Sequence, residues 1–169
     1  MALDATVGGA SADSYVTVAE MDTYFSGRGV TSYDNATTAE KEFAAKDVTF
    51  FIDSKYAGAW KGSIVADSQA LSHPRSELKD LEGRSIATTA IAPQVKNAVF
   101  SMVEAGLTDE NLFVRDEAEG RIIETENVVG PIEERIVYQQ AVGSSKSYPQ
   151  VDLILKPLLK TGGGKLVRN

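Results

Sequence analysis

The 169-residue chain contains no cysteine, and its only histidine is His73. The absence of cysteine excludes disulfides, thiolate metal sites and cysteine nucleophiles. A single histidine excludes metal motifs that need a histidine pair and leaves a catalytic triad without support. His73 precedes Pro74, and we expect it to be a structural residue. The sequence therefore predicts a protein that is not an enzyme and that holds no cofactor and no metal.

Basic residues are also scarce. The chain has 17 lysines and arginines against 24 acidic residues, a net charge of −7, and no basic cluster longer than two residues. Because proteins bind nucleic acid largely by neutralising phosphates and releasing counterions, tight DNA binding is not expected. A surface that DNA slides past without being held is compatible with this charge.

Long apolar runs are absent too. No run approaches the ~20 apolar residues that a membrane span needs. No N-terminal stretch joins a basic segment to an apolar one, so we expect no signal peptide, no membrane association and folding in a cytoplasm. The length fits a single domain.

What is present favours a mainly α (α+β) fold, a small bundle of about four helices with a β-hairpin. Capping boxes at Thr17/Glu20 and Thr37/Glu40 predict helices over 18–26 and 39–55. Further helices are predicted over 93–106, with Pro93 first, and over 149–159, where Pro157 should kink or end the helix. β-branched residues around Gly130-Pro131 predict a hairpin over about 121–139. The expected apolar faces are Phe43, Val48, Phe51, Ile52 and Tyr56 on the second helix and Val95, Val99, Met102 and Val103 on the third.

Both ends are expected to be extended arms flanking a body at 14–160. Residues 1–13 are small and polar, and 161–169 place three glycines before an apolar and cationic tip. Such a tail can form no core, so we predict that it binds a partner, for example by strand addition with Leu166 and Val167 in pockets. The predicted partner-binding residues are Gly162, Gly163, Gly164, Lys165, Leu166, Val167 and Arg168.

The segment 57–92 shows no clean period and is expected to be a long loop that is functional or is held in place by a partner. Trp60 is expected to pack in the core with Tyr56 and Phe51, rather than to stack on bases. Arg75 is expected to bind backbone carbonyls or a carboxylate and thereby fix the loop. The predicted structural motif comprises Trp60, Lys61, Gly62, Gln69, Pro74 and Arg75.

Two other kinds of site have little support. The run Gly162–Lys165 resembles a phosphate-binding loop, but Leu159 and Leu166 occupy positions where that loop needs glycine and serine or threonine. The carboxylates between 109 and 134, among them Glu124 and Glu126, are interpreted as a solvated acidic face rather than a glycosidase pair.

Several segments, taken in order, resemble the family of head–tail connector proteins of tailed bacteriophages, also called adaptor or head-completion proteins. Many members of that family are labelled as DnaT-like single-stranded-DNA-binding proteins. One departure is His73, at a position where members often carry tryptophan. The segments that carry the resemblance are Ser14–Glu20, Tyr24-Phe25 and Arg28-Gly29; Tyr56 with Trp60–Gly62; Gln69, Leu71 and Pro74-Arg75; Ile91, Pro93 and Val95-Lys96; Val129–Ile132; and Tyr148-Pro149, Asp152 and Leu158-Leu159.

The resemblance implies a structural protein of the virion neck, assembled in the host cytoplasm. It would form a homo-oligomeric ring, usually dodecameric, beneath the portal protein and dock the tail or a second neck protein. DNA would pass through its channel without specific binding. The alternative is a DnaT-like replication protein that holds single-stranded DNA, and a carboxylate-based hydrolase is a distant third.

Overall fold

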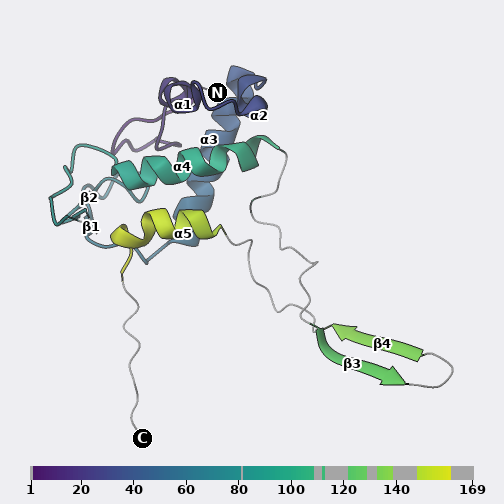
Figure 1. Ribbon diagram of the computed structural model, residues 1–169. Coiled ribbons are helices and arrows are strands. Elements are labelled where there is room, and N and C mark those ends of the chain that lie inside the picture. Colours follow the sequence, from purple (N-terminus) through teal and green to yellow (C-terminus); the bar gives the residue numbers. More distant parts are fainter. Residues whose placement is uncertain are drawn as a thin grey trace, which may run out of the picture. The chain divides into compact units, whose positions relative to one another are not determined.

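The computed structural model describes residues 2–80, 82–108, 112, 122–128, 133–138 and 148–160 (Figure 1). The chain divides into two compact units, one comprising 1–112 with 148–169 and the other 113–147. The first unit contains helices α1 (Val18–Phe25), α2 (Thr31–Asp34), α3 (Thr38–Lys55), α4 (Pro93–Leu107) and α5 (Pro149–Leu155), followed by the 3-10 turn Lys156–Leu158. The prediction of a mainly α fold with a small sheet is confirmed.

Both predicted capping boxes are present. Thr17 Oγ1 accepts a hydrogen bond from the Glu20 backbone N–H, and the Glu20 carboxylate accepts one from Thr17 N–H. Thr37 and Glu40 make the same reciprocal pair at the start of α3. Each box satisfies backbone donors that have no partner within the helix, so these two boundaries follow from local sequence.

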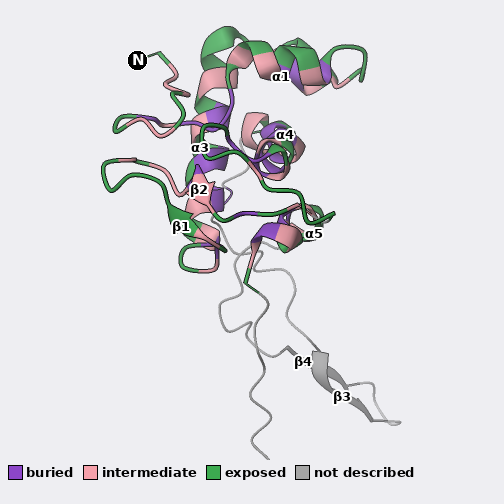
Figure 2. Ribbon diagram, turned by 90° about the vertical axis from the view of Figure 1, so that its left-hand side faces the viewer, coloured by how far each residue is buried: buried purple, intermediate pink, exposed green. Residues whose placement is uncertain are grey.

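The core lies where α3 packs on α4 and α4 packs on α5. Helix α4 contributes all four of its predicted core residues, and Figure 2 shows buried residues in purple on α3, α4 and α5. Pro93 and Pro149 each open a helix, as expected from their missing N–H. Near Pro157 the α-helix gives way to the 3-10 turn, which agrees with a predicted break there.

The predicted apolar stripe of α3 is wrong at one position. Val48, Phe51, Ile52 and Tyr56 are buried, but Phe43 is 63% exposed. Phe43 precedes Val48 by five residues, or about 140° around the helix, so the two side chains leave α3 in different directions. The buried face begins instead with Ala44 and Ala45.

The second unit contains the predicted hairpin. Strand β3 (Ile122–Val128) pairs antiparallel with β4 (Glu133–Tyr138), and Glu126 lies opposite Arg135. The register is irregular between Ile122 and Glu124. The predicted span of about 121–139 is confirmed.

The N-terminal segment has no helix or strand, but it does not project as an arm. The Asp4 carbonyl accepts hydrogen bonds from the backbone N–H groups of Asp13 (2.8 Å) and Ser14 (3.2 Å). The Asp4 carboxylate in turn accepts from Thr6 N–H and Ser11 Oγ. These local bonds fold residues 4–14 back on themselves, so the expectation of an extended arm over 1–13 is corrected. The C-terminal tail 161–169 lies outside the described residues.

Candidate functional site

The six predicted motif residues come together in the segment between α3 and α4. We call Trp60, Lys61, Gly62, Gln69, Pro74 and Arg75 the motif cluster. The same segment contains the short strands β1 (Ser63–Ile64) and β2 (Arg75–Ser76), which pair antiparallel. The Arg75 guanidinium donates to the carbonyls of Lys61 (2.7 Å), Gly62 (2.8 Å) and Ser72 (3.3 Å). Of the two kinds of partner considered for Arg75, backbone carbonyls and a carboxylate, its hydrogen bonds go to the carbonyls.

Gly62 is required by the close approach of the two strands. Its φ is +65°, and a Cβ at this position would lie 2.0 Å from the Ser76 carbonyl oxygen. Any larger residue would have to push backbone away from backbone, because Ser76 has no flexible atom there to move. Gly62 thus keeps β1 and β2 within hydrogen-bonding range.

Gln69 closes the other end of the segment. Its side-chain oxygen accepts from Val65 and Ala66 N–H, and its side-chain nitrogen donates to the carbonyls of Leu71 (2.7 Å) and Pro74 (3.1 Å). The Ala70 N–H donates to the Gly9 carbonyl, 3.0 Å away. The segment is therefore ordered by its own chain, and the alternative that a neighbour orders it is not needed.

A half-buried acid, Asp53, attaches this segment to α3. Asp53 accepts hydrogen bonds from the Tyr15 hydroxyl and from Ser72 N–H, the latter at 2.9 Å. Burial raises the pKa of Asp53 and raises that of Tyr15 well above its usual value. Both carboxylate oxygens of Asp53 are occupied as acceptors, which suits a structural anchor rather than a proton-transfer group.

His73 is buried between aromatic rings. Its ring meets those of Trp60 and Tyr15 edge to face, at centroid distances of 4.6 Å and 5.9 Å. Burial, with a smaller contribution from the Arg75 charge, lowers the pKa of His73 to about 3. His73 is therefore neutral at physiological pH and packs in the core, as expected of a structural histidine.

Trp60 connects the motif cluster to the C-terminal segment. It is 2% exposed and forms a β-bridge with Leu159. Lys61 N–H donates to the Leu158 carbonyl (2.9 Å), and Lys160 N–H donates to the Ala59 carbonyl (2.8 Å). The motif thus fixes the position of Lys160, the residue directly before the C-terminal tail. Trp60, Tyr56 and Phe51 are all buried, so none of them offers a face for base stacking.

The cations of the described part are mostly occupied. Of the eleven lysine and arginine side chains described, five form ion pairs with Asp or Glu, and Arg28, Lys61, Arg75 and Lys160 donate to backbone carbonyls. Lys79 and Lys156 do neither. The ion pairs are Lys41–Asp22, Lys46–Asp13, Lys55–Asp152, Arg84–Asp80 and Lys96–Glu20.

These ion pairs matter through charge balance more than through stability. Exposed pairs of this kind contribute ~0–1 kcal/mol each to folding. A phosphate that recruited one of these lysines would still meet the carboxylate left behind. The described surface therefore offers little net attraction to a nucleic acid backbone.

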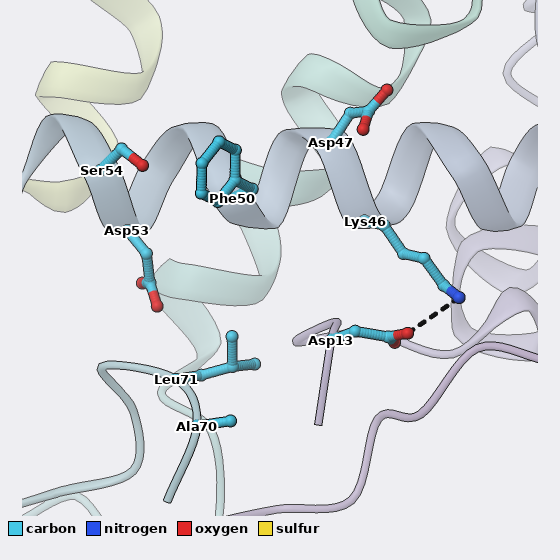
Figure 3. A pocket seen from close by; sticks show the side chains of 8 residues that line it. All are labelled: Asp13, Lys46, Asp47, Phe50, Asp53, Ser54, Ala70 and Leu71. Atoms are coloured by element: carbon cyan, nitrogen blue, oxygen red, sulfur yellow. Dashed lines mark ion pairs between the residues drawn. The ribbon is translucent and has the colours of Figure 1, made fainter. Parts of the chain in front are cut away.

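Two open pockets occur beside the helices. One lies along α3 and is lined by Asp13, Lys46, Asp47, Phe50, Asp53, Ser54, Ala70 and Leu71 (Figure 3). The other lies between α1 and α4 and is lined by Ala19, Glu20, Thr23, Tyr24, Lys96 and Phe100. The α3 pocket was not predicted from the sequence. The seven-residue spacing of Phe43 and Phe50 does indicate a second apolar side of the helix.

Neither metal binding nor membrane insertion has a candidate element in the described residues. They hold no group of three or more His, Asp or Glu side chains placed to share a metal ion. No helix among them has the length and apolar character for crossing a bilayer. The predicted partner-binding residues Gly162–Arg168 and the carboxylates at Glu124 and Glu126 lie where no side chain is described.

A family model described as "Putative DnaT-like ssDNA binding protein" matches residues 1–169, so the chain belongs to this family. No curated protein and no solved structure matches the chain. The family description names single-stranded-DNA binding, which is the alternative function considered from the sequence.

Proposed function

We propose that this member of the DnaT-like family is a non-enzymatic head–tail connector of a tailed bacteriophage. Copies of the chain form a ring, dodecameric by resemblance, below the portal protein. The ring extends the DNA channel and offers a docking surface to the tail or to a second neck protein. The protein belongs to the virion neck after assembly in the host cytoplasm.

The observation that carries this proposal is the occupied state of the described cations. A connector must let DNA pass without retaining it, whereas a protein that holds single-stranded DNA needs a basic groove beside exposed aromatic faces. Here nine of the eleven described lysines and arginines pair with carboxylates or donate to carbonyls, and Trp60 is buried. The exposed Phe43 and Phe50 flank Asp47 rather than a basic groove. The net charge of −7 acts in the same direction.

The hairpin also supports an assembly role. Its described sheet contains only the two strands β3 and β4, grouped in a unit of their own. An isolated two-stranded hairpin is at best marginally stable in water, and it gains stability from a third strand or a packed surface. Neighbouring copies in a ring would provide such a surface.

The experiment is a titration of the full-length chain against a fluorescent single-stranded oligonucleotide, paired with co-sedimentation on isolated portal rings. The connector proposal expects no salt-dependent anisotropy change at micromolar protein and clear co-sedimentation with the portal. Tight, salt-dependent oligonucleotide binding without portal association would contradict it.

The family description favours single-stranded-DNA binding as the second candidate. Such binding would have to use Lys79, Lys156 or basic residues outside the described part. The double variant Lys79→Glu, Lys156→Glu would then bind the oligonucleotide more weakly and with a smaller salt dependence. Unchanged binding by this double variant would place the contact elsewhere in the chain.

A further inference from the structure

The outward side of α3 carries an apolar surface. Phe43, Asp47, Phe50 and Ser54 follow one another at spacings of four, three and four residues, which places them on one side of the helix. Phe43 is 63% exposed and Phe50 is 64% exposed. We call these four residues the outer face of α3. Two largely exposed phenylalanines seven residues apart, about two turns, are unusual on a helix that also buries a full core face.

The α3 pocket adjoins this face. It has a volume of about 470 Å³ and combines the apolar side chains of Phe50, Ala70 and Leu71 with three carboxylates and one ammonium group (Figure 3). Asp13 and Lys46 pair at one end of the lining, Asp53 points toward the loop that carries Leu71, and Asp47 points to the other side of α3 (Figure 3). The pocket therefore suits a ligand with an apolar centre and cationic flanks.

The carboxylates differ in their availability. Asp13 pairs with Lys46 at 2.8 Å, and Asp53 is held by Tyr15 and Ser72. Asp47 is exposed, and it makes no side-chain hydrogen bond or ion pair within the described residues. Asp47 is thus the acid best placed to meet a cation from another molecule.

We propose that the α3 pocket and the outer face of α3 receive the C-terminal tail of a second copy of this chain. The tip Lys165-Leu166-Val167-Arg168 places two apolar residues between two cations. Leu166 and Val167 cover the apolar part of the pocket and Phe43, while Lys165 and Arg168 meet Asp47 and the neighbouring acids. The proposal rests on the connector function, since it names the contact that joins one copy to the next in the ring.

The tail of the same copy is poorly placed for this site. Lys55 and Tyr56 contact Asp152 of α5, and Lys55 lies nine residues beyond Lys46, about two and a half turns, on the opposite side of α3. Lys160, from which the tail starts, follows α5 and is bonded to Ala59. Five residues from Lys160 to Lys165 span at most ~17 Å when fully extended, and they would have to pass around the end of α3. A neighbouring copy has no such constraint.

The test is a titration of a fluorescent peptide of residues 161–169 with the full-length chain, followed by anisotropy. Wild type is expected to bind, and Asp47→Lys is expected to weaken binding about tenfold, ~1.4 kcal/mol. Glu104→Lys is the matched control because it makes the same charge change at an exposed position on α4, outside the pocket, and it should bind as wild type does. A peptide with Lys165→Glu and Arg168→Glu should bind Asp47→Lys better than it binds wild type.

Equal binding by Asp47→Lys and wild type, or no binding by wild type, would overturn the proposal. A second comparison separates a tail of the same copy from that of a neighbour. If the tail docked within its own copy, removal of Gly162–Asn169 would strengthen peptide binding severalfold at dilute protein, and this result would also overturn the proposal. We expect equal affinity with and without the tail.

This assay contains neither portal nor DNA, so its failure is distinguishable from failure of the connector function. Loss of the peptide contact would leave portal co-sedimentation to be judged by itself. Absence of portal binding would likewise leave the charge-swap result intact.

Discussion

Residues 57–92 contain little regular structure, whereas residues 38–55 form the uninterrupted helix α3. The irregular segment is nevertheless bound to its own chain, through the Arg75 guanidinium, the Gln69 amide and the half-buried carboxylate of Asp53. The regular helix leaves two phenylalanines open to solvent. Irregular backbone therefore does not mark the exposed apolar surface described here.

This comparison predicts that substitutions in the motif cluster and substitutions on the outer face of α3 will change different properties of the protein. Residues of the motif cluster are bound within one copy, so their loss should lower the free energy of unfolding. Residues of the outer face of α3 are exposed within one copy, so their loss should change association more than stability. The predictions below test this division.

The largest expected effect is that of Trp60→Ala. Removing a buried tryptophan should lower the free energy of unfolding by about 3–5 kcal/mol, because the vacated space cannot fully collapse. The measurement is urea denaturation followed by circular dichroism. Phe43→Ser is the counterpart on the outer face and should change the free energy of unfolding by less than about 0.5 kcal/mol. Similar losses for the two variants would abolish the distinction.

Arg75→Lys should have the next largest effect on stability. Lysine cannot present the guanidinium fork, so at least two of the three carbonyls would lose their donor, at a cost of about 1.5–3 kcal/mol. Lys79→Ala is the control, because Lys79 makes no such bond among the described residues. Equal unfolding midpoints for Arg75→Lys and wild type would show that the loop is held by other contacts.

His73 should make stability depend on pH. Its pKa is about 3 in the folded protein against 6.5 in the unfolded chain. Between these values the unfolded chain binds the extra proton, so the stabilising contribution is complete above pH 6.5 and is lost as pH falls toward 3. The expected slope is about 1 kcal/mol per pH unit below about pH 6.

The comparison with His73→Phe isolates this contribution. Asp53, whose pKa burial raises, acts in the opposite sense at lower pH, because a raised carboxyl pKa favours the folded state as the solution becomes acidic. Asp53 is present in both proteins, so its effect largely cancels in the difference. If His73 does not titrate as described, the urea midpoints of wild type and His73→Phe will change by the same amount between pH 7 and pH 5.

The smallest expected effect on stability is that of removing Gly162–Asn169. The structure describes the body up to Lys160. Lys160 donates hydrogen bonds to the carbonyls of Ala59 and Gly58, and these bonds do not involve the tail. The truncated chain should therefore unfold at the same urea concentration as the full chain, yet fail to join a ring on the portal. Intact ring formation by the truncated chain, seen by electron microscopy, would contradict the role given to the tail.

Much of the fold could be predicted because it depends on local chemistry. Capping boxes, first-turn prolines and the Gly-Pro break place four of the helix starts and the hairpin within a few residues, but they do not predict α2. Arg75 was also predictable, since a guanidinium within a loop readily binds backbone carbonyls. The course of residues 1–13 could not be read from composition, because it depends on which backbone groups the Asp4 and Gly9 carbonyls meet.

The outer face of α3 shows why site prediction stopped short. A helix with apolar residues on two sides has two possible core faces. The sequence prediction places Phe43 on the same face as the core residues. Only packing reveals that Ala44 and Val48 lie against Gly106 of α4, while Phe43 and Phe50 are exposed. The position of Ala70 and Leu71 beside Phe50 depends on the long loop and has no local signal.

The central claim is that copies of this chain join a portal ring and do not hold DNA. Electron cryomicroscopy of the full-length chain, mixed with portal rings and an excess of single-stranded DNA, tests it most directly. The account predicts a second ring of this chain stacked on each portal and naked DNA in the background. Bare portals beside DNA coated with the protein would contradict it.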